Sequence, residues 1–230
     1  MENKPLPITD VFFDLDHTLW DFEKNSALAF EAVLNVHCPD VDLAEFLKHY
    51  VPLNHAYWER YRKDEVTQAE LRLGRLRDTF AAMAYPAGEE LLALLSDQYI
   101  RQLPQHNHLF DGATELLDYL KTKYRLHIIT NGFDEVQYHK IKNANIGHYF
   151  TTVTNSEMAG VKKPNPVIFE YALKLANAKK ESSIMIGDCI DADVKGALNC
   201  GLDAILFCGL NTNYEGIKCV AHLSEIKIYL

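Results

Sequence analysis

From Leu109 onward, short apolar segments with the length of β-strands alternate with segments of helical periodicity. The predicted strands cover 126–129, 150–154, 184–186 and 204–207, and one more covers about 9–15. Four helices are predicted between these strands. The first begins near Asp111 as its N-cap, the second spans 134–145, the third runs from Pro164 to Leu175, and the fourth ends near Cys200. Apolar strands separated by helices are typical of a parallel sheet that is covered on both faces. The expected fold class is therefore α/β, with a doubly wound (Rossmann-like) parallel sheet.

A long helical insertion separates the first predicted strand from the others. Between Phe22 and about Leu103, apolar residues recur at three- and four-residue spacing, and β-branched residues are few. The run from Thr67 to Glu70 has the form of a capping box that opens a helix. We therefore expect a core formed by residues 1–20 and 104–230, and an all-helical cap domain formed by residues 21–103.

The composition is that of an ordinary globular protein and disfavours several classes. With 32 acidic and 23 basic residues the net charge is −9, which argues against binding of polymeric nucleic acid but not of a small anion. No apolar run approaches the roughly 18 residues of a membrane helix, and no signal peptide is visible. Five cysteines without paired spacing predict reduced, buried thiols in a cytoplasmic protein: Cys38, Cys189, Cys200, Cys208 and Cys219.

Two carboxylates, Asp14 and Asp16, follow the apolar run of the first strand. Residues two apart in an extended chain point to the same face, so both side chains are expected to leave the strand side by side. Two anions so close repel each other unless a cation lies between them, which favours a metal-dependent site. A strand that runs into a polar turn would give the same pattern, so this pair alone does not decide between the two interpretations.

Further polar residues follow the later strands, and ligands bind beyond the carboxyl ends of strands in open parallel sheets. The segments are Thr130-Asn131-Gly132, Lys163 before Pro164, and Gly187-Asp188 with Asp193 downstream. Taken singly, each is more simply a turn, a helix start or an N-cap. Together they bring carboxylates, a hydroxyl, turn amides and an ammonium to one rim. That set suits a phosphate monoester and Mg²⁺.

The two carboxylates of the first strand have distinct expected roles in phosphoryl transfer. Asp14 is the expected nucleophile and forms an aspartyl-phosphate. Asp16 is the expected acid that protonates the leaving oxygen and the base that then takes a proton from water. Asp14, Asp188 and the backbone carbonyl of Asp16 are expected to bind Mg²⁺ through oxygen.

The phosphoryl oxygens need donors and positive charge. Thr130 and the backbone amides of the Asn131-Gly132 turn are expected to donate hydrogen bonds to them. Lys163 is expected to supply the positive charge. Pro164 is expected to start a helix, which would hold Lys163 at its N-terminus.

These segments resemble the four motifs of the haloacid dehalogenase-like (HAD) phosphohydrolase superfamily. Asp14-x-Asp16-x-Thr18 is similar to the first motif, Thr130 to the second, Lys163-Pro164 to the third, and Gly187-Asp188 with Asp193 to the fourth. The resemblance covers nearly the whole chain and implies that Asp193 and Thr18 support the metal or Lys163 from behind. Dehalogenases of the superfamily lack an acidic residue at the position of Asp16, so the resemblance implies phosphatase or phosphomutase chemistry.

The helical insertion carries a pattern that bears on the substrate. At helical spacing Asn54, Trp58 and Tyr61 share one face of a predicted helix, and Arg75 lies in the next predicted helix along the chain. Aromatic rings and an arginine can stack on and hydrogen-bond a nucleobase, although packing within the cap would use the same residues. The pattern, with Gly74-Arg75, is similar to that of the bacterial pyrimidine 5′-nucleotidases of the superfamily. The resemblance implies a nucleoside monophosphate as partner, while the charge and the lack of a long apolar run predict no nucleic acid polymer and no membrane as partners.

Three functions stay open on the sequence alone. The first is a Mg²⁺-dependent nucleoside 5′-monophosphatase, and the second is a phosphatase or mutase acting on a sugar phosphate or phosphoglycolate. The third is a binding protein without activity on the same fold, which would not require Asp16.

Overall fold

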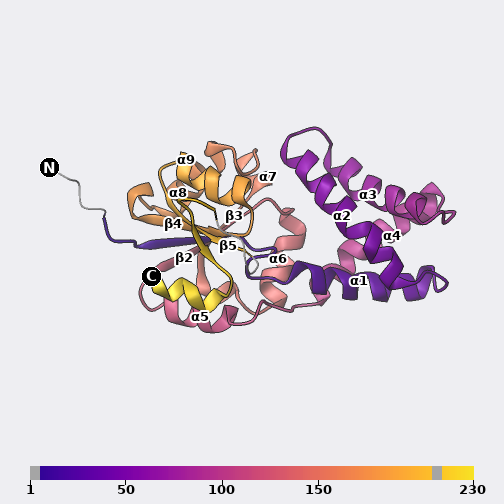
Figure 1. The fold of residues 1–230 in the computed structure, drawn as a ribbon, viewed down its shortest axis with the longest axis horizontal. Coiled ribbons are helices and arrows are strands. Elements are labelled where there is room, and N and C mark those ends of the chain that lie inside the picture. Colours follow the sequence, from indigo (N-terminus) through magenta and orange to yellow (C-terminus); the bar gives the residue numbers. More distant parts are fainter. Residues whose placement is uncertain (1–5, 209–213) are drawn as a thin grey trace. The chain divides into compact units, whose positions relative to one another are not determined.

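The computed structural model describes residues 6–208 and 214–230. The chain divides into two compact units, one formed by Met1–Phe22 with Asn107–Leu230 and the other by Glu23–His106. The first unit contains a six-stranded sheet flanked by helices, and the second is helical (Figure 1). The predicted fold class, an α/β core with an inserted helical domain, is confirmed.

The sheet of the first unit is parallel throughout and has the order β3-β2-β1-β4-β5-β6. Its strands are β1 (Asp10–Phe13), β2 (Arg125–Thr130), β3 (Phe150–Asn155), β4 (Ser183–Gly187), β5 (Asp203–Phe207) and β6 (Lys218–Val220). The strand order reverses at β1, which pairs with β2 on one side and β4 on the other. The carboxyl ends of strands at such a reversal form the usual ligand site of an open α/β sheet.

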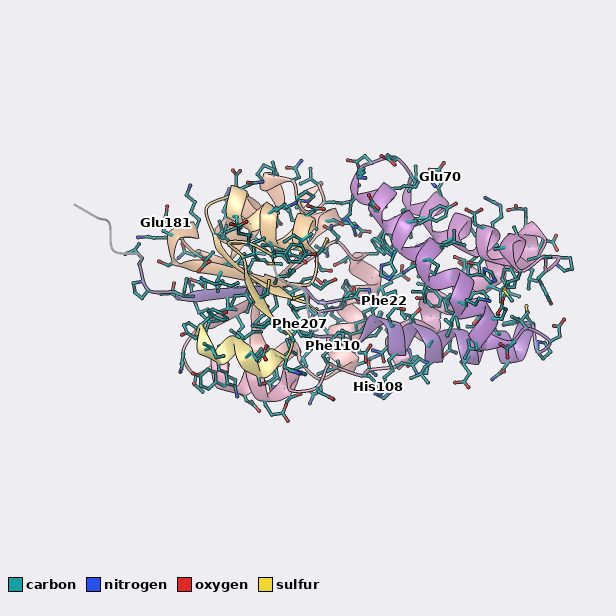
Figure 2. The ribbon with its side chains drawn as sticks, viewed as in Figure 1. Phe22, Glu70, His108, Phe110, Glu181 and Phe207 are labelled. Carbon is teal, nitrogen blue, oxygen red and sulfur yellow. The ribbon has the colours of Figure 1, made fainter. Side chains whose placement is uncertain are left out.

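Helices cover the sheet and bury its apolar side chains. The helices of this unit are α5 (Ala113–Leu120), α6 (Asp134–Asn143), α7 (Ser156–Ala159), α8 (Pro166–Ala176) and α9 (Gly196–Asn199). Figure 1 shows α8 and α9 on one side of the sheet and α5 on the other. Phe12 and Met185 pack with Phe169 of α8 in one buried cluster. Phe110 packs edge-on against Phe207 at the end of β5, with ring centroids 5.3 Å apart (Figure 2).

Several predicted boundaries were wrong. β1 ends at Phe13, two residues before the predicted end. The N-cap of α5 is Gly112 in the left-handed region (φ 81), where a side chain is strained, and not Asp111. α8 begins at Pro166, because the side chain of Asn165 accepts a hydrogen bond from the amide of Val167 and caps the helix.

The segment after β4 and the last strand also differ from expectation. The predicted continuous helix is a π-helical turn (Ile190–Lys195) followed by the short α9. The strand β6 was not predicted, since its three residues, Lys-Cys-Val, show no apolar run. Short 3₁₀ turns occur at Leu103–Gln105, Gly147–Tyr149, Lys180–Ser182 and Leu223–Ile228.

The second unit has its own aromatic core. Its helices are α1 (Phe22–His37), α2 (Leu43–Arg62), α3 (Gln68–Ala82) and α4 (Glu89–Gln102). The rings of Phe30 and Tyr99 stack with centroids 4.1 Å apart, and Tyr50 meets Phe30 edge-on. The predicted capping box at the start of α3 is present between Thr67 and Glu70, which Figure 2 labels.

Two predictions from composition can be compared with the structure. Among the described residues, no helix is both long enough and apolar enough to cross a membrane. All five cysteines carry free thiols, but only Cys38 is buried, so the expectation of five buried thiols was wrong for the other four.

Candidate active site

The chain turns sharply just beyond β1. The amide of Asp14 continues the sheet by donating to the carbonyl of Ile186 at 2.9 Å. The carbonyl of Leu15 then accepts from the amides of Leu19 and Trp20, at 3.0 and 2.9 Å, which closes a tight loop. The loop needs a left-handed residue, and His17 supplies it at φ 63. Asp14 and Asp16 are therefore held at the carboxyl end of the central strand, but their side chains bind different partners.

Asp14 pairs with Lys163. The ammonium lies 2.6 Å from Asp14 Oδ1 and 2.6 Å from Asp193 Oδ1, and it donates to the carbonyl of Ile129 at 2.6 Å. Lys163 is 1% exposed, so these contacts replace its hydration. Burial acts to lower the pKa of Lys163, but the charges of Asp14 and Asp193 hold it above its ordinary value. The lysine is therefore a fixed positive charge.

Lys163 and the three carboxylates around it, Asp14, Asp188 and Asp193, form a cluster with an excess of negative charge. Asp14, Asp188 and Asp193 each offer a carboxylate oxygen, and these oxygens lie within 4.8 Å of one another. Burial raises the pKa of Asp14 well above its usual range, and Lys163 only partly offsets this. Burial and the charge of Asp193 raise the pKa of Asp188 to about 7. Three carboxylates facing one ammonium fit a hard divalent cation, whose charge would offset the burial of the carboxylates.

Asp193 belongs to this cluster, and Thr18 lies beside it. Asp193 binds Lys163, and its Oδ2 accepts from the amide of Cys189 at 3.0 Å. It approaches so closely because Gly187 has no side chain, and a Cβ there would lie 2.3 Å from that oxygen. The buried hydroxyl of Thr18 donates to Asp188 Oδ1 at 3.4 Å, a long hydrogen bond. Both residues thus contact groups of the cluster.

The end of β2 and the turn that follows it hold Thr130 and Asn131 in different ways. Thr130 Oγ1 accepts from the amide of Gly132 at 3.1 Å and from Gln137 Nε2 at 2.8 Å, which leaves the hydroxyl proton available for donation. The side chain of Asn131 instead binds the backbone of Lys163, to which it donates at 3.0 Å and from which it accepts at 2.7 Å. Lys163 is therefore positioned by Asn131, and not by a helix that starts at Pro164.

Two residues of the site were not predicted from the sequence. Gln137 and Lys140 of α6 donate to Asp16 Oδ2 at 2.7 Å and to Asp16 Oδ1 at 2.6 Å. Both are buried, although a glutamine and a lysine within a helix usually face solvent. Their spacing of three residues puts them on one face of α6, and that face also carries the buried Ile141. This polar pair on an otherwise apolar helix face was the sign in the sequence that both residues are buried.

The four cap residues fall into two pairs. Arg75 and Asn54 are 3% and 2% exposed, and Arg75 Nη1 donates to Asn54 Oδ1 at 2.7 Å, which joins α3 to α2. The guanidinium also lies over the ring of Tyr99, 5.3 Å from its centroid. Trp58 and Tyr61 are only partly buried, and their rings meet edge-on with centroids 5.7 Å apart. The first pair is part of the packing of the cap, and the second presents aromatic surface.

A parallel α/β sheet with an inserted helical unit, and a lysine among carboxylates at the ends of β1 and β4, define a class of hydrolases. The sequence profile of the haloacid dehalogenase-like hydrolases matches residues 11–207, so the chain belongs to this family and is a hydrolase. The resemblance inferred from the motifs is confirmed.

Known members of the family show kinds of protein to which the chain is similar. It is 31% identical over 199 residues to the pyrimidine 5′-nucleotidase PynA of Streptococcus pneumoniae, covering 86% of this chain and 82% of that protein. It is 32% identical over 203 residues to a glyceraldehyde 3-phosphate phosphatase of Methanothermobacter thermautotrophicus, covering 85% and 84%. The structure of the HAD-hydrolase YfnB of Bacillus subtilis, bound to magnesium, matches with a TM-score of 0.88 and 26% identity over 98% of this chain and 99% of that one.

Proposed function

We propose that this hydrolase is a Mg²⁺-dependent phosphatase that cleaves phosphate monoesters through an aspartyl-phosphate on Asp14. The observation that carries the proposal is the buried ion pair between Asp14 and Lys163, with Asp188 beside it. A carboxylate next to a fixed cation is oriented for attack on an anionic phosphoryl group. Lys163 binds Asp14 through Oδ1, which leaves Oδ2 as the attacking oxygen.

Each half of the proposed reaction uses the same residues. Asp14 Oδ2 forms a bond to phosphorus while the bond to the leaving oxygen breaks, and Asp16 transfers a proton to that oxygen. Thr130 donates to the phosphoryl oxygens, and the positive charge of Lys163 stabilises the charge that develops on them. A water molecule then gives its proton to Asp16 and attacks phosphorus, which releases phosphate and restores Asp14. Bound Mg²⁺, held by Asp14, Asp188 and the carbonyl of Asp16, would neutralise charge on the phosphoryl group.

The proposed substrate is a nucleoside 5′-monophosphate, with pyrimidine bases preferred. Support comes from the similarity to PynA and from the partly exposed pair of Trp58 and Tyr61. Aromatic faces bind planar bases well, because stacking buries apolar area at little conformational cost. Buried as they are, Asn54 and Arg75 are proposed to fix α2, which carries the aromatic pair, and not to contact the base.

A second candidate is a phosphatase for small sugar phosphates. The similarity to a glyceraldehyde 3-phosphate phosphatase is as high as that to the nucleotidase, and the proposed chemistry of Asp14 and Asp16 would be unchanged. A phosphomutase would use the same carboxylates. For either enzyme we propose that a cytoplasmic metabolite is the substrate.

A substrate screen tests the proposed function directly. With Mg²⁺, the protein is expected to release phosphate from pyrimidine nucleoside 5′-monophosphates such as dUMP and dTMP, and EDTA is expected to abolish the release until Mg²⁺ is restored. The acidic cluster is the physical reason, since its carboxylates repel a phosphate monoester when no cation neutralises them. Rapid release from sugar phosphates but not from nucleotides would favour the second candidate. No metal-dependent release from any monoester would refute the phosphatase.

The aromatic pair gives a separate test of the nucleotide. Trp58→Ala is expected to raise KM for a nucleoside monophosphate about tenfold, which corresponds to about 1.4 kcal/mol of lost binding. Trp58→Phe keeps an aromatic face and is the matched control, for which KM should change far less. The value of kcat should stay near that of the unchanged protein in both variants, because Trp58 is not proposed to act on the reacting atoms. An unchanged KM in Trp58→Ala would contradict stacking on the base.

A further inference from the structure

We propose that Gln137 and Lys140 are positioning residues that orient the carboxylate of Asp16 for proton transfer, an inference that rests on the proposed phosphatase function. Each carboxylate oxygen of Asp16 receives one donor: Gln137 Nε2 lies 2.7 Å from Oδ2, and Lys140 Nζ lies 2.6 Å from Oδ1. Two donors on two oxygens fix the rotation of the carboxylate plane, which a single hydrogen bond would leave free.

Lys140 is itself held in place by aromatic rings. Its ammonium lies 4.2 Å from the ring centroid of Trp20 and 5.3 Å from that of Phe22. Trp20 is fully buried, and its backbone forms a bridge with Asp16 in the loop after β1. The side chain of Lys140 is 3% exposed, whereas that of Asp16 is 20% exposed. The charge is therefore fixed by the protein interior, while the carboxylate that it orients stays accessible.

Gln137 is fixed from a different direction. Its amide donates to Thr130 Oγ1 at 2.8 Å as well as to Asp16, so it links the proposed acid with the proposed phosphoryl donor. The side chain lies directly against Gly132, where a Cβ would come within 2.0 Å of Nε2. The absence of a side chain at Gly132 thus lets Gln137 reach both partners at once.

Burial of Gln137 and Lys140 lowers the stability of the folded protein. Gln137 is 1% exposed, and its Oε1 accepts no hydrogen bond from the described residues. A buried acceptor without a donor and a buried ammonium both cost folding free energy. Hydrophobic residues at these positions of α6 would avoid that cost, which indicates that the pair is arranged around Asp16.

The chemical consequence concerns the leaving group. A general acid is effective only when its proton lies in line with the leaving oxygen, and a carboxylate that can rotate spends less time in that geometry. Losing either donor should therefore slow substrates whose leaving oxygen needs a proton. It should spare substrates whose leaving group departs as a stable anion.

The test compares phenyl phosphate with p-nitrophenyl phosphate, which have similar shape but differ in leaving group. The value of kcat/KM reports the step in which Asp14 is phosphorylated. For Lys140→Met, kcat/KM is expected to fall about 100-fold with phenyl phosphate and less than about threefold with p-nitrophenyl phosphate. For Gln137→Leu the loss with phenyl phosphate should again be the larger, although the lost contact with Thr130 slows both substrates alike. Adding Lys140→Met to Asp16→Asn should cause no further loss, because both act through one proton transfer.

The matched control is Lys142→Met, which removes an exposed ammonium from the same helix and should leave both substrates unaffected. Thermal unfolding of each variant shows whether the fold is kept, and Gln137→Leu tests the inference should Lys140→Met fail to fold. Equal losses with both substrates, or no loss with either, would overturn the inference alone. Failure of the unchanged protein to hydrolyse any monoester would overturn the proposed function, and the inference with it.

Discussion

Replacing Asp14 by Asn is expected to reduce phosphate release by at least about 1000-fold, because the amide oxygen is a poor nucleophile. Stability should stay the same or rise. Burial raises the pKa of Asp14 well above its usual range, which means that the ionised side chain is costly in the folded protein. The neutral isostere removes that cost, and Lys163 keeps its contact with Asp193.

Steady-state kinetics and thermal unfolding in the absence of metal check the two halves of this prediction. Asp191→Asn is the matched control, since Asp191 lies in the same acidic segment as Asp188 but is exposed and pairs with Lys195. It should retain activity and stability. Turnover by Asp14→Asn near that of the unchanged protein would contradict its role as the nucleophile, and a large loss of stability would contradict the electrostatic argument.

Lys163→Met is expected to have the opposite effect on stability and to lower the free energy of unfolding by about 3–5 kcal/mol. Lys163 is 1% exposed and neutralises both Asp14 and Asp193, so its loss leaves two carboxylates buried without their cation. Activity should also be lost, because the phosphoryl oxygens lose their fixed positive charge.

Chemical denaturation of Lys163→Met, and of the double variant with Asp14→Asn, measures this effect. The double variant should be more stable than Lys163→Met, because it removes one of the two uncompensated carboxylates. Lys195→Met removes an exposed ammonium and serves as the control, with little change expected. A loss below about 1 kcal/mol in Lys163→Met would refute the view that this ammonium neutralises the cluster.

The sequence pattern predicted the parts of the fold that depend on local chemistry. Strands β2, β4 and β5 are largely apolar runs whose side chains are buried on both faces of the sheet. The sequence pattern therefore located them within a residue or two. The order of the strands was not predictable, because alternation of strands and helices gives parallel pairing but not neighbours. The short β6 has no pattern of its own and is a strand only because β5 offers it an edge.

The candidate site was predictable where its residues follow strands and not where they lie within helices. Asp14 and Asp188 come directly after strands and Thr130 is the last residue of β2, and parallel packing brings such positions to one rim. Gln137 and Lys140 lie inside α6, and although they share a face with buried apolar residues, the sequence does not show that Asp16 is their partner. The backbone amide of Asn131 stays a predicted donor to the phosphate, whereas the contact of its side chain with the backbone of Lys163 was not predicted, because only the folded loop defines it.

The three contacts of Lys163 couple the assembly of the site to the folding of the sheet. Its ammonium binds a side chain that follows β1, the carbonyl of Ile129 in β2, and Asp193 beyond β4. These groups are far apart along the chain and meet only when the three central strands are paired. An intermediate that lacks any one of the strands would bury a poorly neutralised lysine or leave it in water. The centre of the sheet and the reactive carboxylate should therefore form in one cooperative step, so recovery of activity during refolding would report completion of the core.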